Sequence, residues 1–122
     1  MNAKSLICVF LLSYACLSST FQHINLDTAY VGKSNKWIDY PSGSKGIYMN
    51  VNMEKLNLCK TPIVKTWLTC ISTCWTTTGS TSQYLLTDKG FRVYVYQQHG
   101  NLNPSIASYY KYELHYEIIP VA

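Results

Sequence analysis

A two-residue alternation of side-chain character constrains the fold of this chain more than any other feature. It is clearest in residues 110–118, where tyrosine, leucine and isoleucine alternate with charged residues and a histidine. The same alternation occurs in residues 46–53 and 91–96. Successive side chains of an extended strand point to opposite faces of a sheet, so a period of two is typical of half-buried β-strands. We therefore expect three strands, each with one face in a hydrophobic core.

Four further segments show the alternation more weakly. They are residues 37–39, 63–68, 74–78 and 84–87. Glycine and proline recur at short intervals, which leaves little room for long helices, and residues 98–108 are predicted to form a long polar loop. The sequence therefore predicts an all-β fold, an antiparallel β-sandwich or barrel of about seven or eight short strands.

The first 18 residues have the layout of a secretory signal peptide. Lys4 supplies a positive charge, an apolar stretch follows, and Ser18 is a small residue suited to cleavage, with cleavage after Ala15 as an alternative. An uncleaved membrane anchor is disfavoured, because the apolar stretch is shorter than the roughly 20 residues that span a bilayer. We expect a signal helix at residues 1–18 and a single secreted β domain at residues 19–122. The mature protein is expected outside the cell and not in a membrane.

Cleavage of the signal would leave three cysteines, Cys59, Cys70 and Cys74. Export favours disulfides, and an odd number leaves one thiol free or bonded to another chain. On a straight strand Cys70 and Cys74 would lie about 13 Å apart, too far for a bond, whereas a loop between them would allow one. Pairing of Cys59 with either of them is the alternative. A disulfide-linked homodimer is a further expectation.

Charge and motifs exclude several classes of function. The chain has 10 basic and 6 acidic residues, a net charge of +4, and only 13% charged residues. This positive charge is too low to indicate a nucleic-acid partner. The three histidines are scattered, and neither a serine-nucleophile elbow nor a metalloprotease helix motif is present. We therefore expect a protein that is not an enzyme and needs no cofactor.

Tyrosine is unusually frequent, with 11 residues. In residues 91–96 the alternation places Arg92, Tyr94 and Tyr96 on the face opposite the apolar row, which makes them candidate ligand-binding residues. Exposed aromatic rings can stack on the apolar face of a sugar, while polar groups bond its hydroxyls. The alternative is that most of the aromatic residues are core residues or cross-strand pairs.

A second candidate site lies on the polar face of the C-terminal strand. Glu113, His115 and Glu117 share this face, and neighbours two residues apart on a strand are about 7 Å apart. Their side chains could converge on a metal ion. The alternative is an ordinary solvated strand face with alternating charge.

Several motifs together resemble a family of small secreted invertebrate β-rich domains of unknown function. In order, they are Gly46-Ile47-Tyr48-x-Asn50-Val51-Asn52, Thr61-Pro62, Trp75-x-x-x-Gly79-x-x-Ser82-x-Tyr84 and Thr87-x-x-Gly90-Phe91-Arg92-Val93-Tyr94. The resemblance covers residues 46–119 and implies an extracellular β-rich fold with no assigned catalytic residues. This chain departs from the pattern at residues 69–75, where relatives tend to have a glycine- and serine-rich loop. Cys70 and Cys74 stand there instead, which makes a local disulfide more plausible.

These observations favour a secreted, non-enzymatic structural or interaction protein of an extracellular matrix, such as a cuticle, mucus or shell framework. Its expected partners are matrix polysaccharides or proteins. The alternative is a soluble, lectin-like carbohydrate-binding module, for example in defence. A secreted toxin or protease inhibitor fits less well, because such small scaffolds usually carry more disulfides than three cysteines can form.

Overall fold

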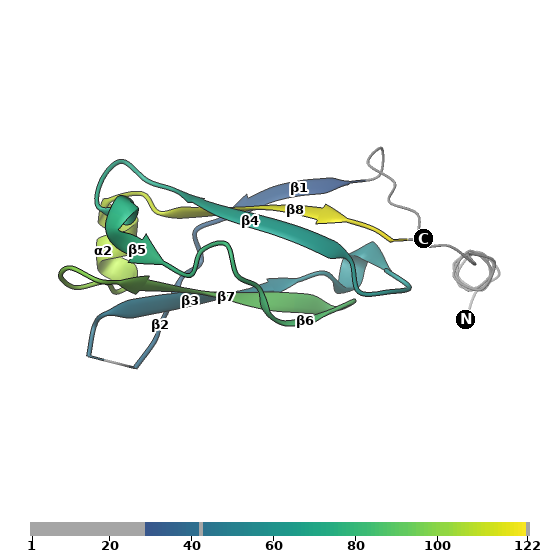
Figure 1. Cartoon of the computed structure of the whole chain (residues 1–122), viewed down its shortest axis with the longest axis horizontal. Coiled ribbons are helices and arrows are strands. Elements are labelled where there is room, and N and C mark those ends of the chain that lie inside the picture. The colour runs from purple at the N-terminus through teal and green to yellow at the C-terminus, as the bar shows by residue number, and fades with distance from the viewer. Residues whose placement is uncertain (1–28, 42, 122) are drawn as a thin grey trace.

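The computed structural model describes residues 29–41 and 43–121, which form two packed β-sheets (Figure 1). One sheet has three strands in the order β1-β8-β4, and the other has five strands in the order β2-β3-β7-β5, with β6 also paired to β7. The strands are β1 (Tyr30–Ser34), β2 (Ile38–Asp39), β3 (Gly46–Asn52), β4 (Ile63–Thr69), β5 (Thr77–Thr78), β6 (Tyr84–Thr87), β7 (Gly90–Gln97) and β8 (Glu113–Ile119). All the hydrogen-bonded pairs of neighbouring strands are antiparallel. The expected antiparallel β-sandwich is confirmed.

The pairing of β3 with β7 runs the full length of β3, from Gly46 opposite Tyr96 to Asn52 opposite Gly90. The inward side chains of both strands are buried and lie opposite one another. These inward pairs are Ile47 with Val95, Met49 with Val93, and Val51 with Phe91. The alternation seen in the sequence therefore separates a core row from an outward row on each strand.

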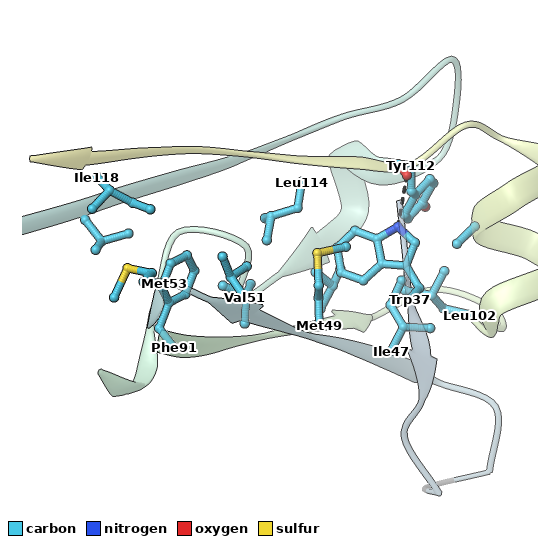
Figure 2. Close-up of a cluster of buried hydrophobic side chains, with 14 residues drawn as sticks. Trp37, Ile47, Met49, Val51, Met53, Phe91, Leu102, Tyr112, Leu114 and Ile118 are labelled. Atoms are coloured by element: carbon cyan, nitrogen blue, oxygen red, sulfur yellow. Dashed lines mark hydrogen bonds between the residues drawn. The ribbon is translucent and has the colours of Figure 1, made fainter. Parts of the chain in front are cut away.

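The core lies between the two sheets (Figure 2) and is closed at one end by Trp37 and Tyr112. Leu114 and Ile118 of β8 contribute from the three-stranded sheet. The buried indole Nε1 of Trp37 donates a hydrogen bond to the carbonyl oxygen of Tyr112 at 2.9 Å. Since the two residues are 75 positions apart, this bond joins the start of the domain to the approach to its last strand.

The prediction of a polar loop at residues 98–108 is wrong in part, because α2 (Pro104–Tyr109) begins within it. The Asn103 side chain accepts a hydrogen bond from the backbone N–H of Ile106, and proline occupies the first turn, a sequence typical of a helix start. The helix ends at Tyr109, Tyr110 is its C-cap, and Lys111 has a positive φ of 55°. The last strand therefore begins at Glu113 and not at the predicted position 110.

Two other elements also differ from the prediction. The expected strand at residues 74–78 is a 3-10 turn, η3 (Cys74–Thr76), followed by the short β5. Strand β1 was not predicted, because it is a short edge strand with a glycine, Gly32, at its centre and no clear alternation of side chains. The ring of Tyr116 covers that glycine, and a Cβ there would lie 2.5 Å from the ring. A second 3-10 turn, η2 (Glu54–Leu56), follows β3.

The predicted signal peptide lies outside the described residues. The described part of the chain contains no helix of the length and apolar character needed to cross a membrane.

Replacement of Trp37 by phenylalanine should lower the free energy of unfolding by about 2–4 kcal/mol. The variant leaves the buried carbonyl of Tyr112 without its donor and opens a cavity. Chemical denaturation would measure the loss, with Trp67→Phe as the matched control, because Trp67 is 40% exposed on the outer face of β4. The control should change stability by about 0.5 kcal/mol or less. Equal losses in the two variants would contradict this role of Trp37.

Candidate functional site

The outward row of β7 and the matching row of β3 form one continuous surface. Arg92, Tyr94 and Tyr96 point away from the core, as the alternation predicted, and lie opposite Asn50, Tyr48 and Gly46, respectively. The three predicted ligand-binding residues thus share one face of the five-stranded sheet. What they contact there depends on the strands on either side.

Tyr94 is the centre of a group of tyrosine rings drawn from several strands. Its ring meets those of Tyr40 and Tyr84 edge to face, with centroid distances of 5.7 and 5.2 Å, and lies tilted 5.8 Å from that of Tyr48. Edge-to-face packing is a favoured arrangement of aromatic pairs. We call Tyr40, Tyr48, Tyr84 and Tyr94 the tyrosine cluster. Tyr94 is half-buried by these neighbours, so it supports the surface more than it presents itself to a ligand.

The Arg92 side chain is fixed against this cluster. Its guanidinium carbon lies 4.6 Å from the centroid of the Tyr48 ring. Its Nε donates to Asn50 Oδ1 at 2.7 Å, and its Nη1 donates to the Tyr94 hydroxyl at 3.2 Å. The hydrogen bond to Tyr94 raises the pKa of Arg92 above the ordinary value, so the group stays charged. Because a guanidinium has five N–H donors, some of them remain available to a ligand beyond these two bonds.

Beside the cluster the surface is indented by a hollow of about 250 Å³. We call it the tyrosine hollow, and its lining residues are Tyr40, Gly46, Ile47, Tyr84, Tyr94, Val95 and Tyr96. Gly46 lies opposite Tyr96 and contributes only main-chain atoms to this lining. Tyr40, Tyr84 and Tyr96 are each about half exposed, at 45%, 51% and 47%. Pockets for drug-sized ligands measure roughly 300–1,000 Å³, so this hollow suits one ring of a larger ligand.

A shallow groove of about 310 Å³ adjoins the cluster on the side of Arg92. It shares Arg92 and Asn50 with the surface just described, and Asn52, Glu54 and Lys89 also line it. Arg92 lines this polar groove and is hydrogen-bonded to Tyr94, which lines the tyrosine hollow, so the two depressions are neighbours on one sheet face. This arrangement offers contacts to more than one unit of a chain-like ligand.

Sequence reasoning missed Tyr40 and Tyr84 as members of the site. Alternation shows which face of its own strand a residue occupies, but it does not show which strands are neighbours. Tyr84 comes from β6, which pairs with β7 opposite Arg92, and Tyr40 directly follows β2. The order of strands in the sheet was the missing information.

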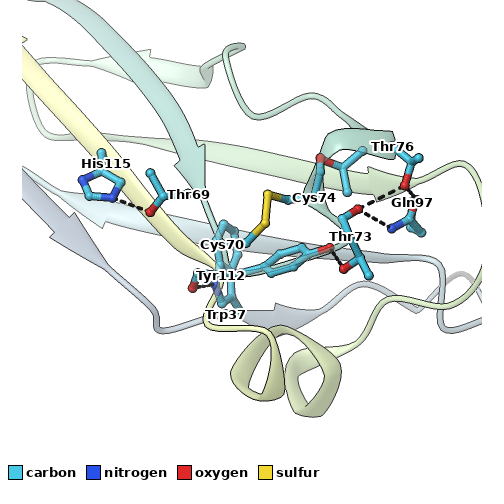
Figure 3. The surroundings of a disulfide bond; sticks show 10 residues. Trp37, Thr69, Cys70, Thr73, Cys74, Thr76, Gln97, Tyr112 and His115 are labelled. Atoms are coloured by element: carbon cyan, nitrogen blue, oxygen red, sulfur yellow. Dashed lines mark hydrogen bonds between the residues drawn. A yellow bond between two sulfur atoms is a disulfide. The ribbon is translucent and has the colours of Figure 1, made fainter.

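The predicted metal-binding residues are not brought together. Glu113 forms an ion pair with Lys33 at 3.5 Å, and His115 Nε2 is hydrogen-bonded to Thr69 Oγ1 at 2.7 Å (Figure 3). The imidazole also stacks on the Trp67 ring, with centroids 5.6 Å apart. Among the described residues, no three histidine, cysteine or acidic side chains form a group that could hold a metal ion.

The structure pairs Cys70 with Cys74 in a disulfide (Figure 3). The chain turns immediately after β4, and this brings the two Cα atoms to 6.2 Å. The segment between Cys70 and Cys74 is therefore a loop, the alternative that allows these two cysteines to bond. Pairing of Cys59 with either of these cysteines is excluded.

Comparisons with protein-family models, with curated proteins and with solved structures found no match to this chain. The resemblance to secreted invertebrate domains stays a prediction from the motifs. The proposed function therefore rests on the geometry and chemistry of the surface described above.

Replacement of Tyr94 by alanine should lower the free energy of unfolding by about 1–3 kcal/mol, because it removes the ring that three other tyrosines contact. Tyr96 makes none of these ring contacts, so Tyr96→Ala should cost about 0.5 kcal/mol or less. Chemical denaturation of both variants checks the difference. If Tyr96→Ala proved the more damaging, Tyr94 would not be the centre of the cluster.

Proposed function

We propose that this is a secreted, non-enzymatic protein of an extracellular matrix that binds polysaccharide through the tyrosine hollow. One observation carries the proposal: a tyrosine-walled hollow shares Tyr94 with a hydrogen-bonded arginine and asparagine, which line the neighbouring groove on the same sheet face. The proposal combines in one protein the two functions expected from the sequence, a matrix protein and a lectin-like carbohydrate-binding module.

The chemistry of the surface suits a sugar ring. A pyranose has an apolar face of C–H groups, which packs on aromatic rings, and a rim of hydroxyls, which need hydrogen-bond partners. Tyr84 and Tyr96 supply exposed rings, and their hydroxyls both donate and accept. Arg92 and Asn50 supply further polar groups in the adjoining groove, on the other side of Tyr94. The adjoining groove gives a second sugar unit a polar surface to lie on.

The absence of catalysis is part of the proposal. Tyrosine, glycine, isoleucine and valine make up the described lining of the tyrosine hollow, so a ligand there meets no carboxylate, thiol or imidazole that could act as a base or nucleophile. Secretion is supported by the predicted signal peptide and agrees with a disulfide, which is typical of oxidising compartments.

Retention of the purified secreted protein on insoluble chitin and cellulose, with soluble oligosaccharide as competitor, tests the proposal. We expect saturable retention that the competitor reverses. Tyr84→Ala and Tyr96→Ala should each weaken it by about 1–3 kcal/mol, or about 5- to 150-fold, if these rings are stacking anchors.

The matched control is Tyr30→Ala. Tyr30 is a 42% exposed tyrosine on β1 of the three-stranded sheet, away from the hollow, and its loss should leave retention unchanged. Equal retention of all three variants would remove the tyrosine hollow from the binding site. Binding of soluble oligosaccharide without retention on the insoluble polymers would favour a soluble lectin over a matrix protein.

A further inference from the structure

Trp75 is the most exposed large hydrophobic side chain in the described part of the chain, at 86%. Tryptophan is on average highly buried, so this exposure calls for an explanation. The residue belongs to η3, directly after the disulfide loop, and borders a groove of about 450 Å³ at one end of the sandwich. We call it the Trp75 groove. It is larger than the tyrosine hollow, and no residue that lines the hollow also lines this groove.

The lining of this groove is aromatic and polar but not formally charged. Trp75, Tyr110 and Ile106 give it apolar surface, and its polar side chains come from Thr73, Thr76, Gln97, His99 and Asn101. In the described lining there is no lysine, arginine or carboxylate. Such a surface complements a neutral ligand that has both an apolar face and hydroxyl groups, which is the character of an uncharged sugar ring.

The groove is also held in a fixed shape. Gln97 is buried, with 3% of its surface exposed, and joins the loop to β7: Thr76 Oγ1 donates to its Oε1 at 2.5 Å, and its Nε2 donates to the Thr73 carbonyl at 3.2 Å (Figure 3). The Thr73 hydroxyl is hydrogen-bonded to the hydroxyl of Tyr112 at 2.7 Å. The disulfide closes the same loop. A ligand at Trp75 would therefore not have to order the loop, which lowers the entropic cost of binding.

The same loop also contains a residue with a strained backbone conformation. Thr73 has a φ of 73°, in the left-handed region that a β-branched residue rarely adopts. Strained residues of this kind persist where the surrounding contacts fix them, and they cluster at ligand-binding sites. The hydrogen bonds and the disulfide just described are contacts of that kind.

The two surfaces face different directions. Tyr96 lines the tyrosine hollow and Gln97 lines the Trp75 groove. These are successive residues of one strand, so their side chains point to opposite sides of the sheet. One sugar ring cannot occupy both positions.

We infer that the Trp75 groove is a second carbohydrate-binding site, for a neutral sugar ring, and that each molecule can bridge two polysaccharide chains. The site itself stands on the groove, and the bridging rests on the proposed function of the tyrosine hollow. Two linked sites also raise the overall avidity for a polymer above that of either site.

The test compares wild-type protein with Trp75→Ala, Tyr96→Ala and the double variant. Retention on insoluble polysaccharide reports binding at either site, and the turbidity or viscosity of a soluble polysaccharide of the same composition reports bridging. Each single variant should still be retained, but its affinity for the insoluble polysaccharide should be about 5-fold or more lower, and it should no longer bridge soluble chains. The double variant should lose both. Trp67→Ala, which removes an exposed tryptophan from the other sheet, should behave as wild type, and thermal melting should show all variants folded.

The outcomes separate the two claims. If Trp75→Ala is retained and bridges as the wild type does, the second site is overturned. If Trp75→Ala abolishes retention while Tyr96→Ala has no effect, the groove is a site, but the tyrosine hollow and the bridging are overturned. If the folded wild-type protein binds none of the polysaccharides tested, the inference and the proposed function fall together.

Discussion

The register between β3 and β7 is the constraint on which the rest of the structure depends. It places Met49 opposite Val93 inside the sandwich and Asn50 opposite Arg92 outside it. A slip of one residue in either strand would exchange the two rows, moving apolar side chains to the surface and polar ones into the core. The hydrophobic core and the central pair of the tyrosine cluster, Tyr48 and Tyr94, are therefore specified by the same ladder, and a substitution that disturbs one face of it is felt on the other.

The second organising feature is a chain of hydrogen bonds at one end of the sandwich. Trp37 donates to the main chain of Tyr112, and the hydroxyl of Tyr112 meets that of Thr73 in the disulfide loop. The buried core is thus connected directly to the loop that presents Trp75. Surfaces fixed in this way lose little conformational freedom when a ligand binds, so more of the contact energy remains as affinity.

The sequence predicted the parts of the structure that depend on local periodicity. Alternation identified the central strands and showed that Arg92, Tyr94 and Tyr96 share the outward face of β7. It could not supply contacts between strands that are distant in sequence, so Tyr84 was not predicted as a site residue. For the same reason it did not show that Lys33, on β1, pairs with Glu113.

The positions of turns were the other feature that local periodicity could not predict. Cys70 could be paired with Cys74 only once the chain was seen to turn after β4. The start of α2 was missed because its signal, an asparagine followed by proline, lies within a polar segment that also resembles a loop.

The most direct test of the account is NMR mapping of a soluble oligosaccharide on the isotopically labelled protein. The account predicts that backbone amide shifts gather on the outer face of the five-stranded sheet, in residues 46–50 and 92–96, and that the Arg92 Nε–H resonance moves with them. Saturating oligosaccharide that shifts only residues of the three-stranded sheet, such as 63–69 and 113–119, would contradict it.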